Sequence, residues 1–331
     1  MRTQRTNFCA VLVAAGLVLL TPAASSALEL FNVGAGVRQG VYSSLGRAIC
    51  AVINRKPLNL ECRVTETQGS IDNLLGLRNG TLDLGVVQSD IQHQAVTGTG
   101  AFEKVGPLAG MQALFSAHGE ALALVARVDS SVRAWDELPG KRINIGPVTS
   151  GTNATMRLLM GAQGWSAATF KALENLGPAD QAEAFCAGRI DVATFLAGHP
   201  NRVVIDLIRN CDGTLVPVTG GLIEKVITQN RAYVRTVIPA DATYATSRDT
   251  PTVGLYATVM TSDRVEADKV YRVTRAVFEN LDFIRAQRPN FRTLDATMMA
   301  FRGLTAPYHP GAARYLRETG HLARKGIGVS P

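Results

Sequence analysis

Apolar and polar residues alternate along the chain with two different periods, so strand-like and helix-like segments follow one another. Three short apolar runs have the length and composition of buried strands: 28–33, 60–66 and 82–88. Between the first two, apolar residues from Val41 to Ile53 recur with the period of an α-helix, and a second helix is expected to begin at Ser70. This βαβαβ order predicts a parallel sheet with helices on both faces.

The same alternation begins again in the second part of the chain. Further strand-like segments are 121–127, 142–146, 190–195 and 252–261, and further helix-like segments are 151–161, 179–187 and 270–284. Two α/β units of roughly 100–130 residues fit this pattern better than one large sheet. The segments 121–127 and 252–261 are the best candidates for crossings between the units. We therefore expect one lobe from residues 28–124 plus 253–331, and a second lobe from residues 125–252.

The first 27 residues have the order of a secretory signal: basic, then apolar, then small. Arg2 and Arg5 precede an apolar run over 8–20, and small residues lead up to Ala27. This pattern predicts export and cleavage after Ala27. The apolar run has 13 residues and is too short to span a bilayer.

Composition and charge describe an ordinary globular surface. The chain has 34 basic and 27 acidic residues, and removal of Arg2 and Arg5 lowers the formal charge from +7 to +5. The charges are spread without a run of five like charges, which favours a solvated surface over nucleic-acid binding. A hydrophobic content of 46% excludes disorder, and no later segment reaches the apolar length of a membrane span.

Four cysteines remain after the signal segment: Cys50, Cys62, Cys186 and Cys211. An even number in an exported chain predicts two disulfide bonds, for which three pairings are possible. We favour the sequential pairing, 50 with 62 and 186 with 211, because each bond would join a helix end to the strand that follows. Each would contribute about 3 kcal/mol by closing a short loop. A zinc site of all four cysteines is the alternative, but the close C-x-x-C pairs typical of such sites are missing.

Four segments that follow strands are rich in glycine and small polar residues: 34–40, 67–73, 88–90 and 146–153. In open α/β sheets, ligands bind beyond the carboxyl ends of the strands. Three of these segments lead directly into expected helices, whose free N–H groups and positive dipole ends favour anions. Ordinary helix capping by Ser and Thr is the alternative for any one segment. Four of them together favour a shared cleft.

The sequence contains no recognisable catalytic constellation. The glycines of 34–40 resemble a dinucleotide motif, but the third is one residue late and no acidic residue follows about twenty positions on. G-x-S-x-G and H-E-x-x-H are absent, and the five histidines are far apart. We therefore expect a binding protein without catalytic residues, metal or cofactor, although an enzyme on the same scaffold stays an alternative.

Taken together, these segments resemble the TAXI family of TRAP-transporter solute receptors over nearly the whole mature chain. The matching motifs are Gly40-Val41-Tyr42 with Gly46, Gly69-Ser70-x-x-Asn73-Leu74, Val87-Gln88-Ser89-Asp90, 138–146 with Ser150-Gly151-Thr152, and the tail 309–320. The resemblance implies a bilobal periplasmic-binding-protein fold of the second structural type. It also implies a periplasmic protein that holds a ligand between its lobes and delivers it to a TRAP membrane subunit. A ligand-sensing protein, or a binding protein for an ABC-type permease, stays an alternative. We expect a monomer.

The ligands known for that family are small carboxylates of the glutamate, glutamine and 2-oxoglutarate kind. Carried over by position, the implied ligand contacts are Gly36, Tyr42, Ser70, Asn73, Gln88, Ser89, Ser150, Gly151, Thr152, Phe195 and Gly198. Ser43 stands where the family often has a second tyrosine, and Arg38 stands where a small or hydroxylated residue is common. Arg38 is either a bidentate partner for a ligand carboxylate or one of many surface arginines.

Overall fold

The computed structural model describes residues 28–322, apart from 39, 241–242 and 245. The expected signal segment, 1–27, lies outside the described residues. The strands are β1 (Glu29–Gly34), β2 (Leu60–Thr65), β3 (Leu84–Gln88), β4 (Met111–Arg127), β5 (Arg142–Asn144), β6 (Ala172–Glu174), β7 (Val192–Ala197), β8 (Gly213–Val216), β9 (Val234–Ile238) and β10 (Thr250–Ser262). The helices are α1 (Val41–Asn54), α2 (Ser70–Asn79), α3 (Ser89–Thr97), α4 (Gly151–Ala162), α5 (Pro178–Cys186), α6 (Arg202–Asn210), α7 (Gly221–Gln229), α8 (Ala267–Phe278), α9 (Leu281–Arg285), α10 (Ala296–Met299) and α11 (Pro310–Glu318).

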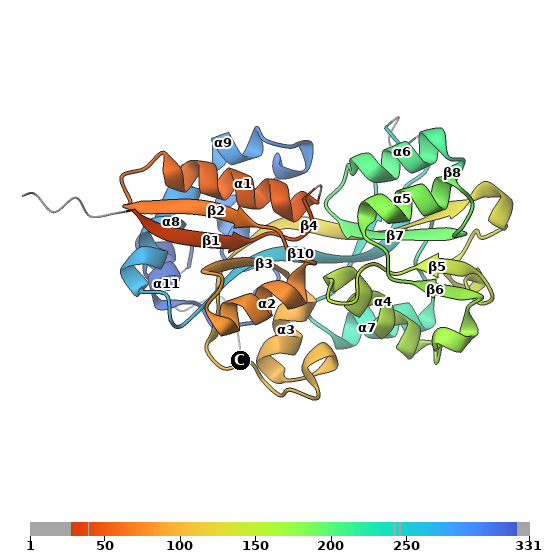
Figure 1. Ribbon diagram of the computed structural model, residues 1–331, viewed down its shortest axis with the longest axis horizontal. Coiled ribbons are helices and arrows are strands. Elements are labelled where there is room, and N and C mark those ends of the chain that lie inside the picture. Colours follow the sequence, from red (N-terminus) through yellow and green to blue (C-terminus); the bar gives the residue numbers. More distant parts are fainter. Residues whose placement is uncertain (1–27, 39, 241–242, 245, 323–331) are drawn as a thin grey trace, which may run out of the picture.

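The elements form two groups side by side, which we call the first and second lobes (Figure 1). The first lobe contains β1–β3 with α1–α3 and α8–α11, and the second contains β5–β8 with α4–α7. Within each lobe three short strands pair in parallel, in the orders β2-β1-β3 and β6-β5-β7, whereas β8 pairs antiparallel with β4. The α/β fold expected from the sequence is therefore confirmed, and the parallel arrangement holds inside each lobe.

Two long strands, β4 and β10, run through both lobes. β10 lies antiparallel between β3 and β4, so the two parallel parts are joined into one mixed sheet. The expectation of two separate sheets is thus wrong at the level of hydrogen bonding. The sequence pattern missed this because β4 begins ten residues before the expected segment 121–127 and carries polar residues within its first half.

The hydrophobic cores of the two lobes are nevertheless distinct. Along β10, one cluster, which includes Trp135, ends at Leu255, and another, which includes Phe31 and Phe115, begins at Ala257. The boundary between the two clusters therefore lies between Leu255 and Ala257 of β10. Each lobe therefore packs its own interior, and the crossing strands are the connection between them.

Both disulfide bonds lie within a single lobe and follow the pairing that the sequence favours. Cys50 in α1 is bonded to Cys62 in β2, as expected for a helix joined to the following strand. Cys186 at the end of α5 is bonded to Cys211, which follows α6, a helix that the sequence pattern had not indicated. The second bond therefore joins the ends of two helices.

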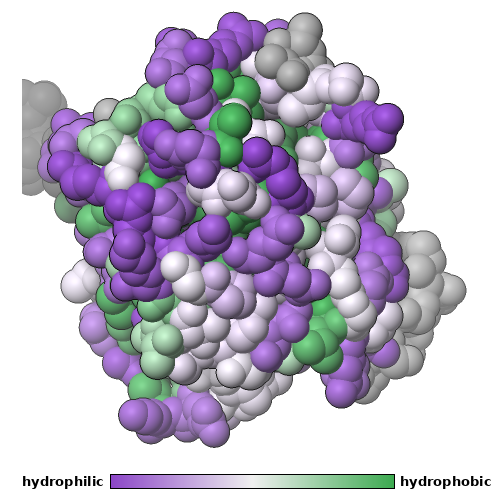
Figure 2. All heavy atoms as spheres, turned by 90° about the vertical axis from the view of Figure 1, so that its right-hand side faces the viewer, coloured by the Kyte–Doolittle hydropathy of each residue, from purple (hydrophilic) through white to green (hydrophobic). Residues whose placement is uncertain are grey.

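The face of the second lobe seen in Figure 2 is mostly hydrophilic, with scattered hydrophobic residues. Val128, Leu222 and Val237 are exposed, and they are far apart in the sequence. Single exposed apolar residues are normal on a solvated surface. Over the described ranges, none of the helices combines the length and apolar character that crossing a bilayer requires.

Candidate functional site

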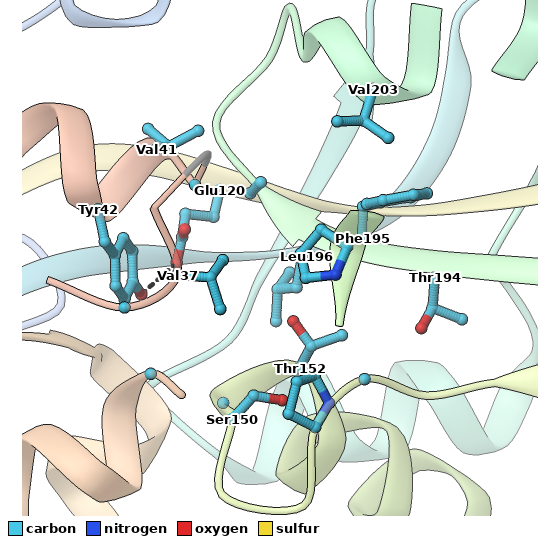
Figure 3. A pocket seen from close by; sticks show the side chains of 18 of the residues that line it. Val37, Val41, Tyr42, Glu120, Ser150, Thr152, Thr194, Phe195, Leu196 and Val203 are labelled. Carbon is cyan, nitrogen blue, oxygen red and sulfur yellow. Dashed lines mark hydrogen bonds between the residues drawn. The ribbon is translucent and has the colours of Figure 1, made fainter. Parts of the chain in front are cut away.

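A pocket lies between the lobes, where the carboxyl ends of the parallel strands face each other (Figure 3). The space between its walls is about 950 Å³, which includes volume open to solvent. The first lobe contributes the segments after β1, β2 and β3, and the second contributes those after β5 and β7. The segments that the sequence singled out therefore meet in one place.

The first residues of five helices line this pocket: Val41 (α1), Ser70 (α2), Gly151 (α4), Pro178 (α5) and Arg202 (α6). Each helix start carries partial positive charge and N–H groups that lack partners within the helix. Helices from both lobes therefore make the pocket favourable for an anion.

Side-chain caps occupy the start of α4 but not those of α1 and α2. Ser150 Oγ accepts a hydrogen bond from the Asn153 N–H, whereas α1 and α2 begin after glycines that offer no side-chain acceptor. Gly69 has a φ of +130°, and a Cβ there would lie 3.4 Å from Ser150 Cα in the other lobe. Glycine is thus needed at this position both for backbone conformation and for close approach of the lobes.

The lobes touch at the back of the pocket. The Ile71 N–H donates to the Thr149 carbonyl oxygen at 3.2 Å, which joins the start of α2 to the segment before α4. Gln88 lies against Gly151, and its buried Oε1 atom has no hydrogen-bond partner among the described residues. Gln88 therefore brings to the pocket wall a buried acceptor that no described residue satisfies.

A buried carboxyl group, Glu120 on β4, lies on the pocket wall close to Tyr42 (Figure 3). The Tyr42 hydroxyl donates to Glu120 Oε2 at 3.0 Å. Burial, and secondly the charge of Glu120, hold the pKa of Tyr42 well above its ordinary value, so the phenol keeps its proton and acts as a donor. Neither residue pattern nor spacing had pointed to Glu120.

Two arginines that lack acidic partners stand near one another on the first-lobe side. Arg288 lines the pocket, is half-buried, and its side chain has no hydrogen bond or ion pair within the described part of the chain. Burial, and then the charge of Arg47, lower the pKa of Arg288. Within the described ranges, the Arg47 guanidinium bonds to uncharged oxygen atoms, namely the Arg38 carbonyl and the Ser43 and Ser44 hydroxyls. Arg288 therefore brings to the pocket a positive charge that no carboxylate among the described residues pairs with.

Arg202, which lines the pocket from the second lobe, differs from these two because it forms an exposed ion pair with Asp206. The pocket also contains an uncharged donor, since the Thr152 hydroxyl has no partner within the described ranges. Among the residues the structure describes, no group of three or more His, Cys, Asp or Glu side chains comes together as a metal site.

Eight of the twelve expected ligand contacts line the pocket: Gly36, Tyr42, Ser70, Gln88, Ser150, Gly151, Thr152 and Phe195. The other four lie elsewhere. Arg38 is turned to solvent, with 82% of its side chain exposed, and pairs with Glu66 at 3.2 Å. This placement corrects the interpretation in which Arg38 meets a ligand carboxylate, because Glu66 already holds its guanidinium at the surface.

Asn73, Ser89 and Gly198 support the site from behind instead of lining it. The Asn73 Nδ2 atom donates to the Val86 carbonyl at 2.7 Å, within the first lobe. Ser89 Oγ donates to the Ala232 carbonyl at 3.1 Å and thereby joins the two lobes. A Cβ on Gly198 would lie 2.5 Å from Asn290 Nδ2, so Gly198 serves close packing.

A model of the NMT1-like family matches residues 33–320, which is most of the chain. The chain belongs to the NMT1-like family. Among solved structures, this NMT1-like protein is similar to MatC from Rhodopseudomonas palustris with bound malate, with a TM-score of 0.54, 14% identity, and coverage of 80% of this chain and 89% of that one. It is also similar to PhnD1 from Prochlorococcus marinus in complex with methylphosphonate, with a TM-score of 0.53, 11% identity, and coverage of 89% and 99%.

A third similar structure is a putative L-cystine ABC transporter from Listeria monocytogenes, with a TM-score of 0.50, 14% identity, and coverage of 80% of this chain and 95% of that one. At sequence identities this low, the similarity shows a shared fold and no more. The NMT1-like protein therefore has the bilobal fold of periplasmic binding proteins, as the sequence resemblance implied.

Proposed function

We propose that this NMT1-like protein is an extracytoplasmic receptor that captures a small carboxylate between its lobes and delivers it to a membrane permease. The observation that carries the proposal is the meeting of five helix starts, contributed by both lobes, on one pocket. Such an arrangement favours binding of an anion, and contacts from both lobes stabilise the closed state around it. MatC has this fold and is described with bound malate, and PhnD1 has it and is described in complex with methylphosphonate, so the fold is able to hold small anions.

The interactions available are sufficient for useful affinity. Each helix start contributes about 0.3–1 kcal/mol, and each hydrogen bond to a charged group about 1.5–3 kcal/mol. Two helix starts and three such bonds amount to roughly 5–11 kcal/mol before ordering costs. A micromolar dissociation constant corresponds to about −8 kcal/mol. Donors for these bonds are at hand in Ser70, Thr152 and Arg288.

In this proposal the lobes are residues 28–124 plus 253–331 and residues 125–252, and the monomeric protein works in the periplasm. The sequence resemblance supports a TRAP-type permease as its partner. An ABC-type permease is the second candidate, because one structure of this fold is described as a putative L-cystine ABC transporter. The neighbouring genes can distinguish the two kinds of permease, because a gene for a fused TRAP membrane subunit beside this one would favour the TRAP-type permease.

A thermal-shift screen tests the proposal, with L-glutamate, L-glutamine, L-leucine, L-alanine, their 2-oxo acids, malate and methylphosphonate as probes. We expect at least one carboxylate to raise the melting temperature in a saturable way, and the variant Thr152→Val to weaken that response. Val148→Ala, which changes an exposed residue of the same segment, is the matched control. Mass spectrometry of the probe recovered from the protein should find it chemically unchanged.

Two results would contradict the proposal. If no carboxylate raises the melting temperature at millimolar concentration, the solute is not a small carboxylate of the kinds tested. Chemical conversion of a bound probe would instead support an enzyme on this scaffold.

A further inference from the structure

Glu120 presents an acidic group to a pocket that is otherwise favourable for anions. Its side chain is 1% exposed and lies on the pocket wall, beside Tyr42 (Figure 3). The Tyr42 hydroxyl donates to Oε2, and no other hydrogen bond to this carboxyl group occurs among the described residues. A carboxylate can accept about four hydrogen bonds, so most of its capacity is unused.

The neighbouring residues do not supply a hydrogen-bonded positive charge. The nearest basic atom is His118 Nε2, at 3.8 Å from Glu120 Oε1, which is too long for a hydrogen bond. Both ring nitrogens of His118 are themselves buried without partners. The pocket-lining Arg288 makes no ion pair with Glu120, and Arg202 pairs with Asp206. A buried carboxylate without a hydrogen-bonded cation is unfavourable and attracts one.

We propose that Glu120 is the specificity-determining residue that receives an ammonium group, so that the pocket selects amino acids over the corresponding 2-oxo acids and over dicarboxylates. This inference rests on the proposed function, because it assigns the second end of the carboxylate ligand. The helix starts hold the acidic end, and Glu120 with the Tyr42 hydroxyl faces the basic end.

The chemical difference between the ligand classes explains why amino acids would bind more tightly. An ammonium group donates three hydrogen bonds and carries the opposite charge to Glu120. A 2-oxo group places an acceptor against an acceptor, and a second carboxylate places like charges together, so each opposes binding. A pocket with helix starts on one side and Glu120 on another is therefore complementary to a zwitterion.

The test compares the dissociation constants of matched probes by titration calorimetry: L-glutamate with 2-oxoglutarate, L-leucine with 4-methyl-2-oxopentanoate, and L-alanine with pyruvate. For the pair that binds, we expect the wild-type protein to prefer the amino acid at least tenfold. In Glu120→Gln, which keeps the shape and an acceptor for Tyr42, the amino acid should bind at least tenfold more weakly and the oxo acid equally or more tightly. Glu66→Gln changes an exposed carboxylate outside the pocket and should keep the wild-type ratio.

The outcomes separate this inference from the proposed function. Binding of oxo acids or malate as tight as that of amino acids in the wild-type protein overturns the inference and leaves the receptor function standing. An unchanged ratio in Glu120→Gln, or an equal loss for both classes with a lower melting temperature, assigns Glu120 a structural role and also overturns it. The wild-type ratio needs no variant, so poor folding of Glu120→Gln does not remove the test. No binding of any carboxylate overturns both.

Discussion

Replacement of Gly151 by alanine should block the contact between the lobes at the back of the pocket. A Cβ at this position would lie 1.7 Å from Gln88 Oε1, 2.3 Å from Gln88 Cδ and 2.9 Å from Ser70 Oγ. Both neighbours belong to the first lobe, whereas Gly151 begins a helix of the second. The added methyl group therefore requires Gln88 to move away or the lobes to stay apart.

The expected magnitude follows from the cost of overpacking. Inserting a methyl group into a filled contact costs about 1–3 kcal/mol, which corresponds to a loss of affinity of about 5- to 140-fold. Gly151 lies in ordinary helical backbone, where alanine lowers the entropy of the unfolded chain and contributes about 0.4–1 kcal/mol of stability. The melting temperature of the free protein should thus change little while ligand binding weakens.

Titration calorimetry with the tightest probe from the screen measures the affinity, and small-angle scattering measures compaction on binding. Gly161→Ala is a close control, because it lies in the same helix and its added Cβ would have no described heavy atom within 4 Å beyond its chain neighbours and its own helix backbone. The reasoning is refuted if Gly151→Ala binds within twofold of the wild-type protein and compacts to the same extent.

Two further predictions follow from charges. Arg288→Ala should weaken binding of the same probe about tenfold, and less at 500 mM than at 50 mM salt, because it removes an unpaired cation from the pocket; Arg38→Ala should stay within twofold, and the reverse order in calorimetry would contradict the site. Burial raises the pKa of Asp90 from 3.8 to about 6, despite hydrogen bonds from Tyr233 and Thr155. Because the folded state then holds a proton more tightly than the unfolded chain, the stabilising contribution is complete below pH 3.8 and is lost as pH rises through 6. Urea unfolding of wild type and Asp90→Asn between pH 4 and 8 should show the wild type losing stability relative to the variant as pH rises, and a constant difference would refute this.

The sequence was informative where local pattern decides structure. Alternation of strands and helices placed the segments 34–40, 67–73 and 146–153 at carboxyl ends of strands, and this rule alone brought them to a common pocket. The elements that were missed are short or, like α6, follow irregular segments. β4 was recognised only over its second half, because polar residues interrupt its first half.

Two pocket-lining residues that the sequence could not indicate, Glu120 and Arg288, owe their position to tertiary geometry. Glu120 reaches the pocket because β4 crosses between the lobes at that point, and crossing is a property of strand order rather than of local pattern. Arg38 and Arg288 are both loop arginines, yet one pairs with Glu66 at the surface and the other lines the pocket. The direction of a loop side chain is set by such distant partners.

The position of β10 between β3 and β4 has a consequence for biogenesis. This central strand, which ends at Ser262, emerges from the ribosome long after both neighbours, and Arg288 follows later still. A nascent chain that has not reached them leaves two strand edges bare, each able to pair wrongly or with another copy. The pocket is thus complete only once β10 and Arg288 have joined the fold, and shortened products should be substrates for quality-control proteases.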